Sequence, residues 1–265
     1  MNKNLIGVFD AVNEAWTLVK KNLNLFLYIG IGLQLLSAVV NWLLLGKVVT
    51  DVDTLNSGNL VSLIPSFSLS FLFAIVLGSL ISLSLALLVI KTSRGETVTI
   101  NSLINDVLKV YFKFLAVEFI VGAIVVVGFI LLIIPGIIFS AWFFAAIFIL
   151  LEQNTDVFEA IKQSKNLVAG LTAEVLLRFA LGALLLICAS IIFGILVSFP
   201  ISVVGKGPLK NLLDSVVEAI FNGATSVMSV AFTYVIYRSL KNLKSSSPAE
   251  TAPEQPAPEA PTPAT

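Results

Sequence analysis

Residues 114–151 read FLAVEFIVGAIVVVGFILLIIPGIIFSAWFFAAIFILL, and Glu118 is the only charged residue among them. A helix that crosses the bilayer core of about 30 Å needs roughly 20 such apolar residues. The Pro135–Gly136 pair divides the stretch, because proline removes a backbone donor and glycine permits a tight reversal. The stretch therefore predicts two membrane helices joined as a hairpin.

The whole chain shares this character, since 57% of its residues are hydrophobic and only 12% are charged. Soluble domains have about 25% charged residues. Apolar runs suited to membrane helices occupy residues 23–45, 60–90, 114–134, 137–151, 173–199 and 212–240. No clear small-residue cleavage site follows the first run, so we expect a retained helix and not a cleaved signal peptide. The predicted fold is an all-α polytopic membrane protein with about six transmembrane helices in three hairpins.

A near-repeat precedes two of these hairpins. Residues 8–19 read VFDAVNEAWTLV, and residues 157–168 read VFEAIKQSKNLV. Polar residues recur in each copy at i, i+3, i+4 and i+7, which is one stripe of an α-helix. A fainter copy at residues 100–111 carries the same stripe as Ser102, Asn105, Asp106 and Lys109. We therefore expect an amphipathic interfacial helix before each hairpin.

Signals for the start and the end of a helix are clearest in the copy at residues 157–168. Asp156 with Glu159 resembles a capping box, and Gly170 stands where a C-cap glycine would, which predicts a helix over residues 156–169. The predicted division of the chain is amphipathic segments at 1–22, 91–113 and 152–171, hairpins at 23–90, 114–151 and 172–240, and a Pro-, Ala- and Glu-rich tail at 241–265. The tail lacks the apolar residues of a core, so we expect it to be disordered.

Basic residues are divided unequally between the two sides of the predicted spans. Thirteen Lys and Arg residues lie on the side of the termini, and only Lys47, Lys206 and Lys210 lie on the other. The positive-inside rule then predicts that both termini are cytoplasmic. A hairpin at residues 114–151 that spans the membrane and one that re-enters it both keep their ends inside, so the charges leave these two alternatives open.

Several kinds of chemistry are excluded by composition. The chain has no histidine, and Cys188 is its only cysteine, which rules out a His/Cys metal site, an intrachain disulfide and a His-based triad. Net charge is zero and the basic residues are dispersed, so nothing indicates nucleic-acid binding. We expect no enzymatic activity, no metal and no cofactor.

Ionisable residues beside the spans are weak candidates for a binding site. Glu118 lies about one turn inside a run, Glu174 and Arg178 are spaced i, i+4, and so are Asp214 and Glu218. Near a span end a charge reaches the interface at small cost. Glu174 with Arg178 is most simply an ion pair on one helix face. The alternative is a role for Glu118 or Glu218 in proton coupling, ion binding or headgroup recognition.

Small residues recur at every fourth position of the second run. They are Ser66, Ser70, Ala74, Gly78, Ser82 and Ala86. Such a stripe permits the close approach of a neighbouring helix, so we predict that this run packs at the centre of the bundle. The serines could instead line a polar pore.

Residues 130–171 combine the apolar turn at Pro135 and Gly136, a span that ends near Glu152, and the segment EAIKQS followed by Gly170. This combination resembles the multi-spanning bacterial membrane domain attached to some glycerophosphoryl diester phosphodiesterases, and related uncharacterised membrane proteins. In that family hydrolysis belongs to a separate soluble barrel domain. The resemblance therefore implies a membrane module of unknown activity in a bacterial cytoplasmic membrane, and not an esterase.

Two classes of function fit these features. The first is a non-enzymatic module for envelope organisation, lipid association or complex assembly, with the bilayer and a membrane protein or a second copy as partners. The alternative is a transporter of small solutes or lipids. A deep carboxylate or a water-filled cavity between spans would favour transport. A sealed bundle with an exposed apolar groove would favour binding of a partner or lipid. An enzyme acting on lipid would need polar groups that converge at one depth.

Overall fold

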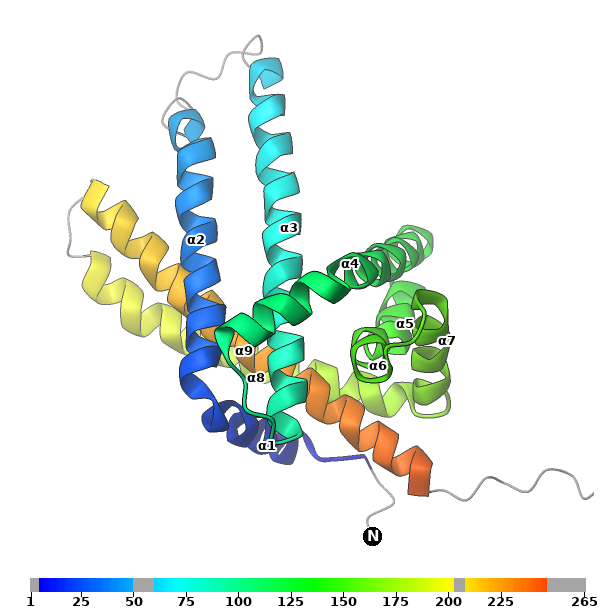
Figure 1. Cartoon of the computed structure of the whole chain (residues 1–265). Helices are drawn as coiled ribbons and strands as arrows, with labels where there is room; N and C mark the ends of the chain where they lie inside the picture. The colour runs from blue at the N-terminus through cyan, green and yellow to red at the C-terminus, as the bar shows by residue number, and fades with distance from the viewer. Residues whose placement is uncertain (1–4, 50–59, 203–207, 247–265) are drawn as a thin grey trace, which may run out of the picture.

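The computed structural model describes residues 5–49, 60–202 and 208–246, and within these ranges it contains helices and no strands (Figure 1). The helices are α1 (Val8–Lys21), α2 (Leu23–Val49), α3 (Leu60–Ser93), α4 (Ile100–Leu131), α5 (Ile133–Phe143), α6 (Ala146–Gln153), α7 (Val157–Val168), α8 (Thr172–Ser202) and α9 (Pro208–Ser246). Most of the tail predicted to be disordered, residues 247–265, lies outside the described residues.

Six helical segments of the described chain are long and apolar enough to cross a membrane. They lie in α2, α3, α4, α8 and α9, and in the stretch formed by α5 and α6. The predicted class, an all-α polytopic membrane protein, is therefore confirmed.

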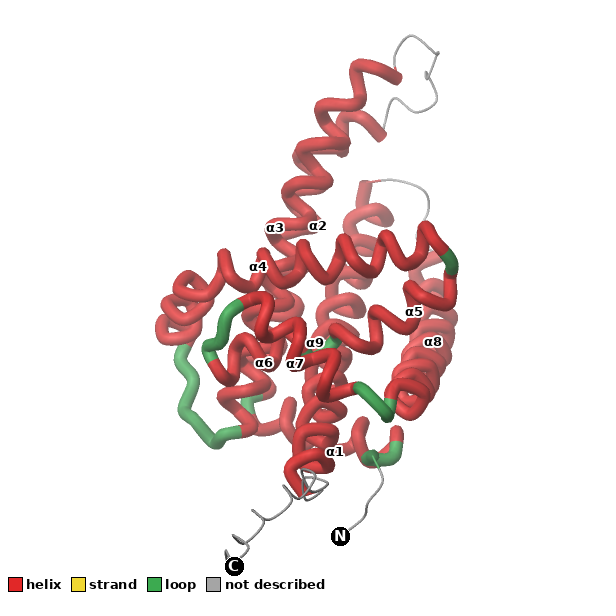
Figure 2. Tube along the Cα trace, turned by 90° about the vertical axis from the view of Figure 1, so that its right-hand side faces the viewer, coloured by secondary structure: helices red, strands yellow, loops and turns green. Residues whose placement is uncertain are grey.

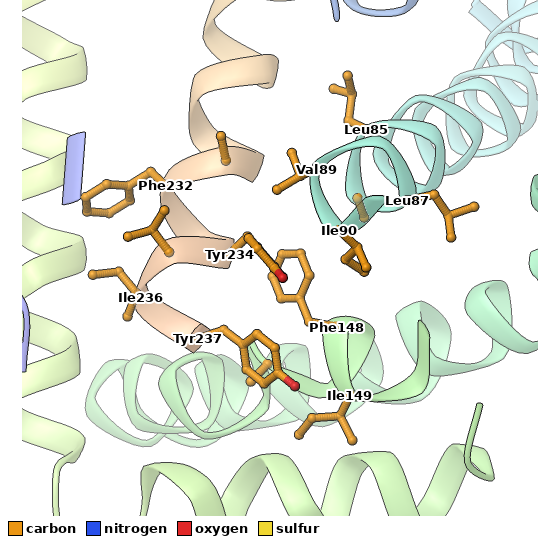
Figure 3. Close-up of a cluster of buried hydrophobic side chains, with 14 of the residues drawn as sticks. Leu85, Leu87, Val89, Ile90, Phe148, Ile149, Phe232, Tyr234, Ile236 and Tyr237 are labelled. Atoms are coloured by element: carbon orange, nitrogen blue, oxygen red, sulfur yellow. The ribbon is translucent and has the colours of Figure 1, made fainter. Parts of the chain in front are cut away.

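Side-chain burial is concentrated at one end of the molecule. This end, here called the base, consists of α1, α6 and α7 together with residues 81–93 of α3, 100–117 of α4 and 227–246 of α9. Figure 3 shows part of its core, where Phe148 of α6 lies beside Tyr234 and Tyr237 of α9, at ring-centroid distances of 5.4 and 5.6 Å. The base thus has the packing of a small globular domain.

Polar contacts join the helices of the base. Asn22 Nδ2 donates to Thr92 Oγ1 at 2.9 Å, which fixes the start of α2 beside the end of α3. Arg238 of α9 pairs with Glu14 of α1. Further along α9, Lys244 donates to the Asn166 carbonyl of α7. The last turns of α9 therefore hold both copies of the near-repeat.

Three pairs of helical segments extend from the base. They are the α2–α3 pair, the α4–α5 pair, and α8 with the N-terminal half of α9 (Figures 1 and 2). Their outer surfaces carry large exposed apolar side chains, including those of Tyr28, Val39, Phe71, Leu72, Phe119, Ile191, Ile195 and Leu196. A soluble protein would bury such side chains, whereas a lipid-facing surface leaves them exposed.

The helix predicted over residues 156–169 is α7. Asp156 is its N-cap, and its carboxylate accepts from the Phe158 amide at 3.3 Å. Glu159 does not complete a capping box, because its carboxylate accepts from Gln163 of the next turn. Gly170 follows the helix with φ of +84°, a backbone conformation that favours glycine.

Two predicted boundaries differ in the structure. Residues 100–111 are the first turns of α4, so the third amphipathic segment is continuous with the membrane run and not a separate helix. The predicted span at residues 137–151 is interrupted between α5 and α6, and most residues from Ala141 to Leu150 are buried in the base. An apolar run of this length suits a buried core helix as well as a membrane helix, which is why the sequence alone did not separate the two.

The chain reverses between α4 and α5 at Leu132, three residues before the predicted Pro135. Leu132 is extended, with φ of −162° and ψ of 149°. Pro135 lies in the first turn of α5, where its missing N–H has no helical partner to lose. Gly136 packs against Gly128 of α4, since a Cβ added at Gly128 would lie 3.0 Å from the Gly136 Cα, and one added at Gly136 would lie 2.5 Å from the Phe129 ring. Pro135 and Gly136 therefore lie in the contact between α4 and α5 and do not form the reversal itself.

Candidate functional site

Among the described residues, the charged candidates do not form one cluster, and the ion pair that joins two of them lies within α8. Glu174 and Arg178 form the predicted i, i+4 ion pair at 3.6 Å. Arg178 also donates to the carbonyls of Leu5 and Ile6 at 3.0 and 3.2 Å, so it ties the segment before α1 to α8. This arginine therefore has a structural role at the base.

The other candidates lie apart from that contact. Asp214 pairs with Lys210 at 2.5 Å, one turn before it, and Glu218 is exposed on α9. Glu118 is half-buried in α4, and within the described ranges no hydrogen bond or ion pair reaches its carboxylate. None of these residues lines the cavity described below.

Glu152 is the centre of the most extensive side-chain network in the described structure. Its Oε1 accepts from the Tyr234 hydroxyl and its Oε2 from the Tyr237 hydroxyl, both at 3.0 Å. Lys241 pairs with Oε2 at 2.6 Å, and Ser93 of α3 lies 2.7 Å from the Tyr234 hydroxyl. The network therefore joins α6 to α9 directly, and reaches α3 through Tyr234 and Ser93.

A cavity of about 390 Å³ lies where α2, α3, α8 and α9 separate above the base. Its polar lining consists of Gln34, Ser82, Thr225, Ser226 and Ser229, and its remaining lining of Gly78, Ile81, Leu85, Leu186 and Val230. None of the described residues that line it is charged. The volume is within the range of small-molecule sites, roughly 300–1,000 Å³, and the combination of apolar walls with a few polar groups is typical of them.

Gln34 is the largest polar side chain in this cavity. It stands 11 residues beyond the first residue of α2, which is about 17 Å along the helix and close to half of the bilayer core. Across the residues that the structure covers, no protein group hydrogen-bonds its amide. An amide in hydrocarbon without a partner costs about 2–7 kcal/mol, so a polar group of a bound molecule would be favourable at this position.

The small-residue stripe of α3 does not form one continuous helix contact. Ser70 and Ala86 are buried, but Ala74 and Gly78 are exposed, and nothing lies within 4 Å of a Cβ added at Gly78. The side chain of Ser66 lies outside the described set. Gly78 and Ser82 line the cavity instead, so the close packing predicted at Gly78 is wrong, and of the stripe's serines Ser82 contributes a hydroxyl to the cavity.

The close helix contact is made by two other glycines. A Cβ added at Gly30 of α2 would lie 2.9 Å from the Gly223 carbonyl oxygen of α9, and one added at Gly223 would lie 2.8 Å from the Gly30 carbonyl group. These two backbones therefore touch directly, as in other small-residue contacts between membrane helices.

Sequence reasoning missed the cavity because its residues come from four helices. The available signals were an amide near the middle of the first run and hydroxyls at positions 225, 226 and 229 of the last run. Either signal alone is ordinary in a membrane helix, since Ser and Thr also bond their own backbone.

No group of three or more His, Cys, Asp or Glu side chains in the described ranges could hold a metal ion. Comparison of the chain with protein-family models, with curated proteins and with solved structures finds no match.

Proposed function

We propose that this chain is a multi-pass protein of the bacterial cytoplasmic membrane with both termini in the cytoplasm. The excess of basic residues on the side of the termini supports this orientation. Several of them, including Lys91, Arg238 and Lys241, make ion pairs within the base. The base would therefore lie at the cytoplasmic surface, and the three helix pairs would extend into the bilayer.

The function that the geometry supports best is binding of a small uncharged polar or amphipathic molecule inside the membrane, as the site of a solute or lipid transporter. The observation that carries this proposal is the cavity around Gln34, whose amide has no protein partner in the described structure. A polar cavity between spans favours transport over a purely architectural module. Residues 130–171 resemble a phosphodiesterase-associated membrane domain of unknown activity, and this resemblance is compatible with a transporter.

The lining indicates the chemistry of the ligand. An amide and four hydroxyls donate and accept hydrogen bonds but carry no charge, so they match hydroxyl or ester groups better than phosphate or ammonium groups. The apolar walls formed by residues such as Leu85 and Leu186 match a short hydrocarbon portion. Glycerol and diacylglycerol share the hydroxyl chemistry and differ in whether acyl chains are present. Among the described residues, the lining offers no titratable side chain as a general acid or base, which supports binding over catalysis.

The test uses the full chain in nanodiscs and measures binding of radiolabelled glycerol and of short-chain diacylglycerol. The variant Gln34→Leu removes the amide at nearly constant size, and Gln153→Leu makes the same change at an exposed residue at the end of α6. We expect Gln34→Leu to weaken binding of one of the two probes about tenfold, the effect of one lost hydrogen bond worth about 1.4 kcal/mol, with Gln153→Leu unchanged.

The two probes separate the sources of the ligand. Binding of glycerol alone would indicate a solute site, and binding of diacylglycerol alone would indicate a lipid site. If neither probe binds, or if Gln34→Leu binds as well as the parent protein, the cavity holds only water and the proposal is wrong.

A further inference from the structure

The α5 side of the α4–α5 pair has a short exposed apolar surface. Exposed large side chains run from Ile100 to Leu131 on α4, but only from Leu132 to Ile137 around the start of α5. From Ala141 onward the chain is mostly buried in the base. On α8, in contrast, exposed apolar residues extend from Leu177 to Leu196.

The end of α5 is fixed at the level of the polar surface of the base. Trp142 Nε1 donates to Thr172 Oγ1 at 3.1 Å, and the Trp142 carbonyl accepts from Ser164 Oγ at 2.7 Å. The ammonium group of Lys165 lies 4.7 Å from the Trp142 ring centroid. A tryptophan held between an amphipathic helix and a lysine is typical of the membrane interface.

The length of α5 then limits how far the α4–α5 pair can extend. The 11 residues of α5 correspond to about 16 Å, whereas the bilayer core is about 30 Å thick. Even if α5 ran along the membrane normal, the reversal at Leu132 would stop near the middle of the bilayer. Figures 1 and 2 show that α4 also lies across the lower part of α3 and not alongside it. Both features keep the reversal on the side of the base.

The backbone of the reversal suits an apolar setting. The Leu132 amide donates to the Gly128 carbonyl at 3.0 Å, and the Gly136 amide donates to the Leu132 carbonyl at 3.4 Å. Pro135 has no amide hydrogen, so it removes one of the donors that the first turn of a helix leaves without a partner. These two bonds and the missing donor of Pro135 reduce the number of unpaired groups exposed to hydrocarbon, where each is costly.

We propose that the α4–α5 pair is a re-entrant hairpin, which enters and leaves the membrane on the side of the base and inserts into a single leaflet. The acyl chains of that leaflet would cover its exposed end, which consists of Phe129, Ile130, Leu131, Leu132, Ile133 and Ile134. This inference concerns the membrane topology and is independent of what the cavity near Gln34 binds. By length and composition, α4 and the α5–α6 stretch could each cross a membrane. Because Trp142 is held at the base, however, the part of α5 between Leu132 and Trp142 is too short to reach the other side.

The test is cysteine labelling of the full chain in a Cys188→Ala background, where the native cysteine no longer reacts. Ile133→Cys reports the reversal, Lys162→Cys on the exposed face of α7 reports the base, and Ser57→Cys reports the segment that joins α2 to α3. In oriented vesicles we expect a membrane-impermeant maleimide to label Lys162→Cys from one side, Ser57→Cys from the other, and Ile133→Cys from neither. Labelling of Ile133→Cys from the same side as Ser57→Cys would show a full crossing and overturn the proposal.

A spin label at the same cysteine identifies what covers the reversal. A label surrounded by acyl chains relaxes strongly with oxygen and weakly with a water-soluble nickel complex. We expect this result at Ile133→Cys and also at Ile130→Cys, which guards against failure of one variant to fold. Dipolar broadening between labels would mean that a second copy covers the surface, and protection from both relaxants would mean another protein segment. Either outcome would overturn insertion into lipid.

Discussion

At Gly30 and Gly223, the absence of a side chain allows α2 and α9 to approach each other closely. Their backbones touch where α2 crosses α9, and a Cβ at Gly30 would also lie 2.7 Å from Val227 Cγ2. We expect Gly223→Ala to destabilise the fold by about 1–3 kcal/mol, because the two helices must move apart. Gly78→Ala is the matched control, since nothing lies within 4 Å of its added Cβ. Thermal unfolding of both variants in the same detergent measures the difference, and equal stability of the two would contradict the contact.

The sequence could identify such residues only in part. The four-residue spacing in α3 correctly indicates a helix, but it drew attention to Gly78, which lines the cavity, and away from Gly223, which makes the contact. Spacing defines a face of one helix, whereas a close approach depends on which face of a second helix meets it. The cavity at Gln34 was missed for the same reason, because its lining comes from four helices.

At the scale of the element, the near-repeat is a repeat of packing as well as of sequence. Ala11 and Ala15 of α1 are fully buried, and so are the corresponding Ala160 and Ser164 of α7. The fainter copy buries the equivalent Leu103 and Val107 of α4. The residues Phe9 and Phe158, which also correspond, are 77% and 71% exposed. The polar stripe therefore indicated the helical segments, and the structure shows that their buried faces pack within the base.

This equivalence predicts the effect of enlarging the buried positions. Ala11→Leu and Ala160→Leu should each destabilise the protein by about 1–3 kcal/mol, because a well-packed site has no room for three more carbons. Phe9→Leu, at an exposed position of the same helix, should change stability by less than about 0.5 kcal/mol. Unfolding midpoints of the three variants test this. A helix that merely lay on the membrane would tolerate Ala11→Leu as well as Phe9→Leu.

At the scale of the whole molecule, the chain separates into a packed base and lipid-exposed helix pairs. Hydropathy predicted the helical membrane class, because both environments need apolar residues. Hydropathy could not tell the two environments apart. Residues 83–90 of α3 are buried by protein and so are most of residues 146–150 of α6, whereas residues 69–76 of α3 are largely exposed. The division follows from the polar ties around Glu152, which link segments far apart in sequence. The charged residues singled out in the sequence did not predict this division, since Glu118 and Glu218 lie outside the network around Glu152.

The last turns of α9 are the part of the molecule on which the base depends most. They supply Tyr237 and Lys241 to Glu152, and Arg238 to Glu14 of α1. We expect a chain truncated after Ile236 to lose the folded base, with exposed apolar surface and aggregation on size-exclusion chromatography. Truncation after Ser246 removes only the Pro-, Ala- and Glu-rich segment and should leave the elution profile and unfolding midpoint unchanged. If the shorter chain stayed monodisperse with the same midpoint, the helix pairs would be held together by contacts within the membrane, and the base would be an accessory to the fold and not its core.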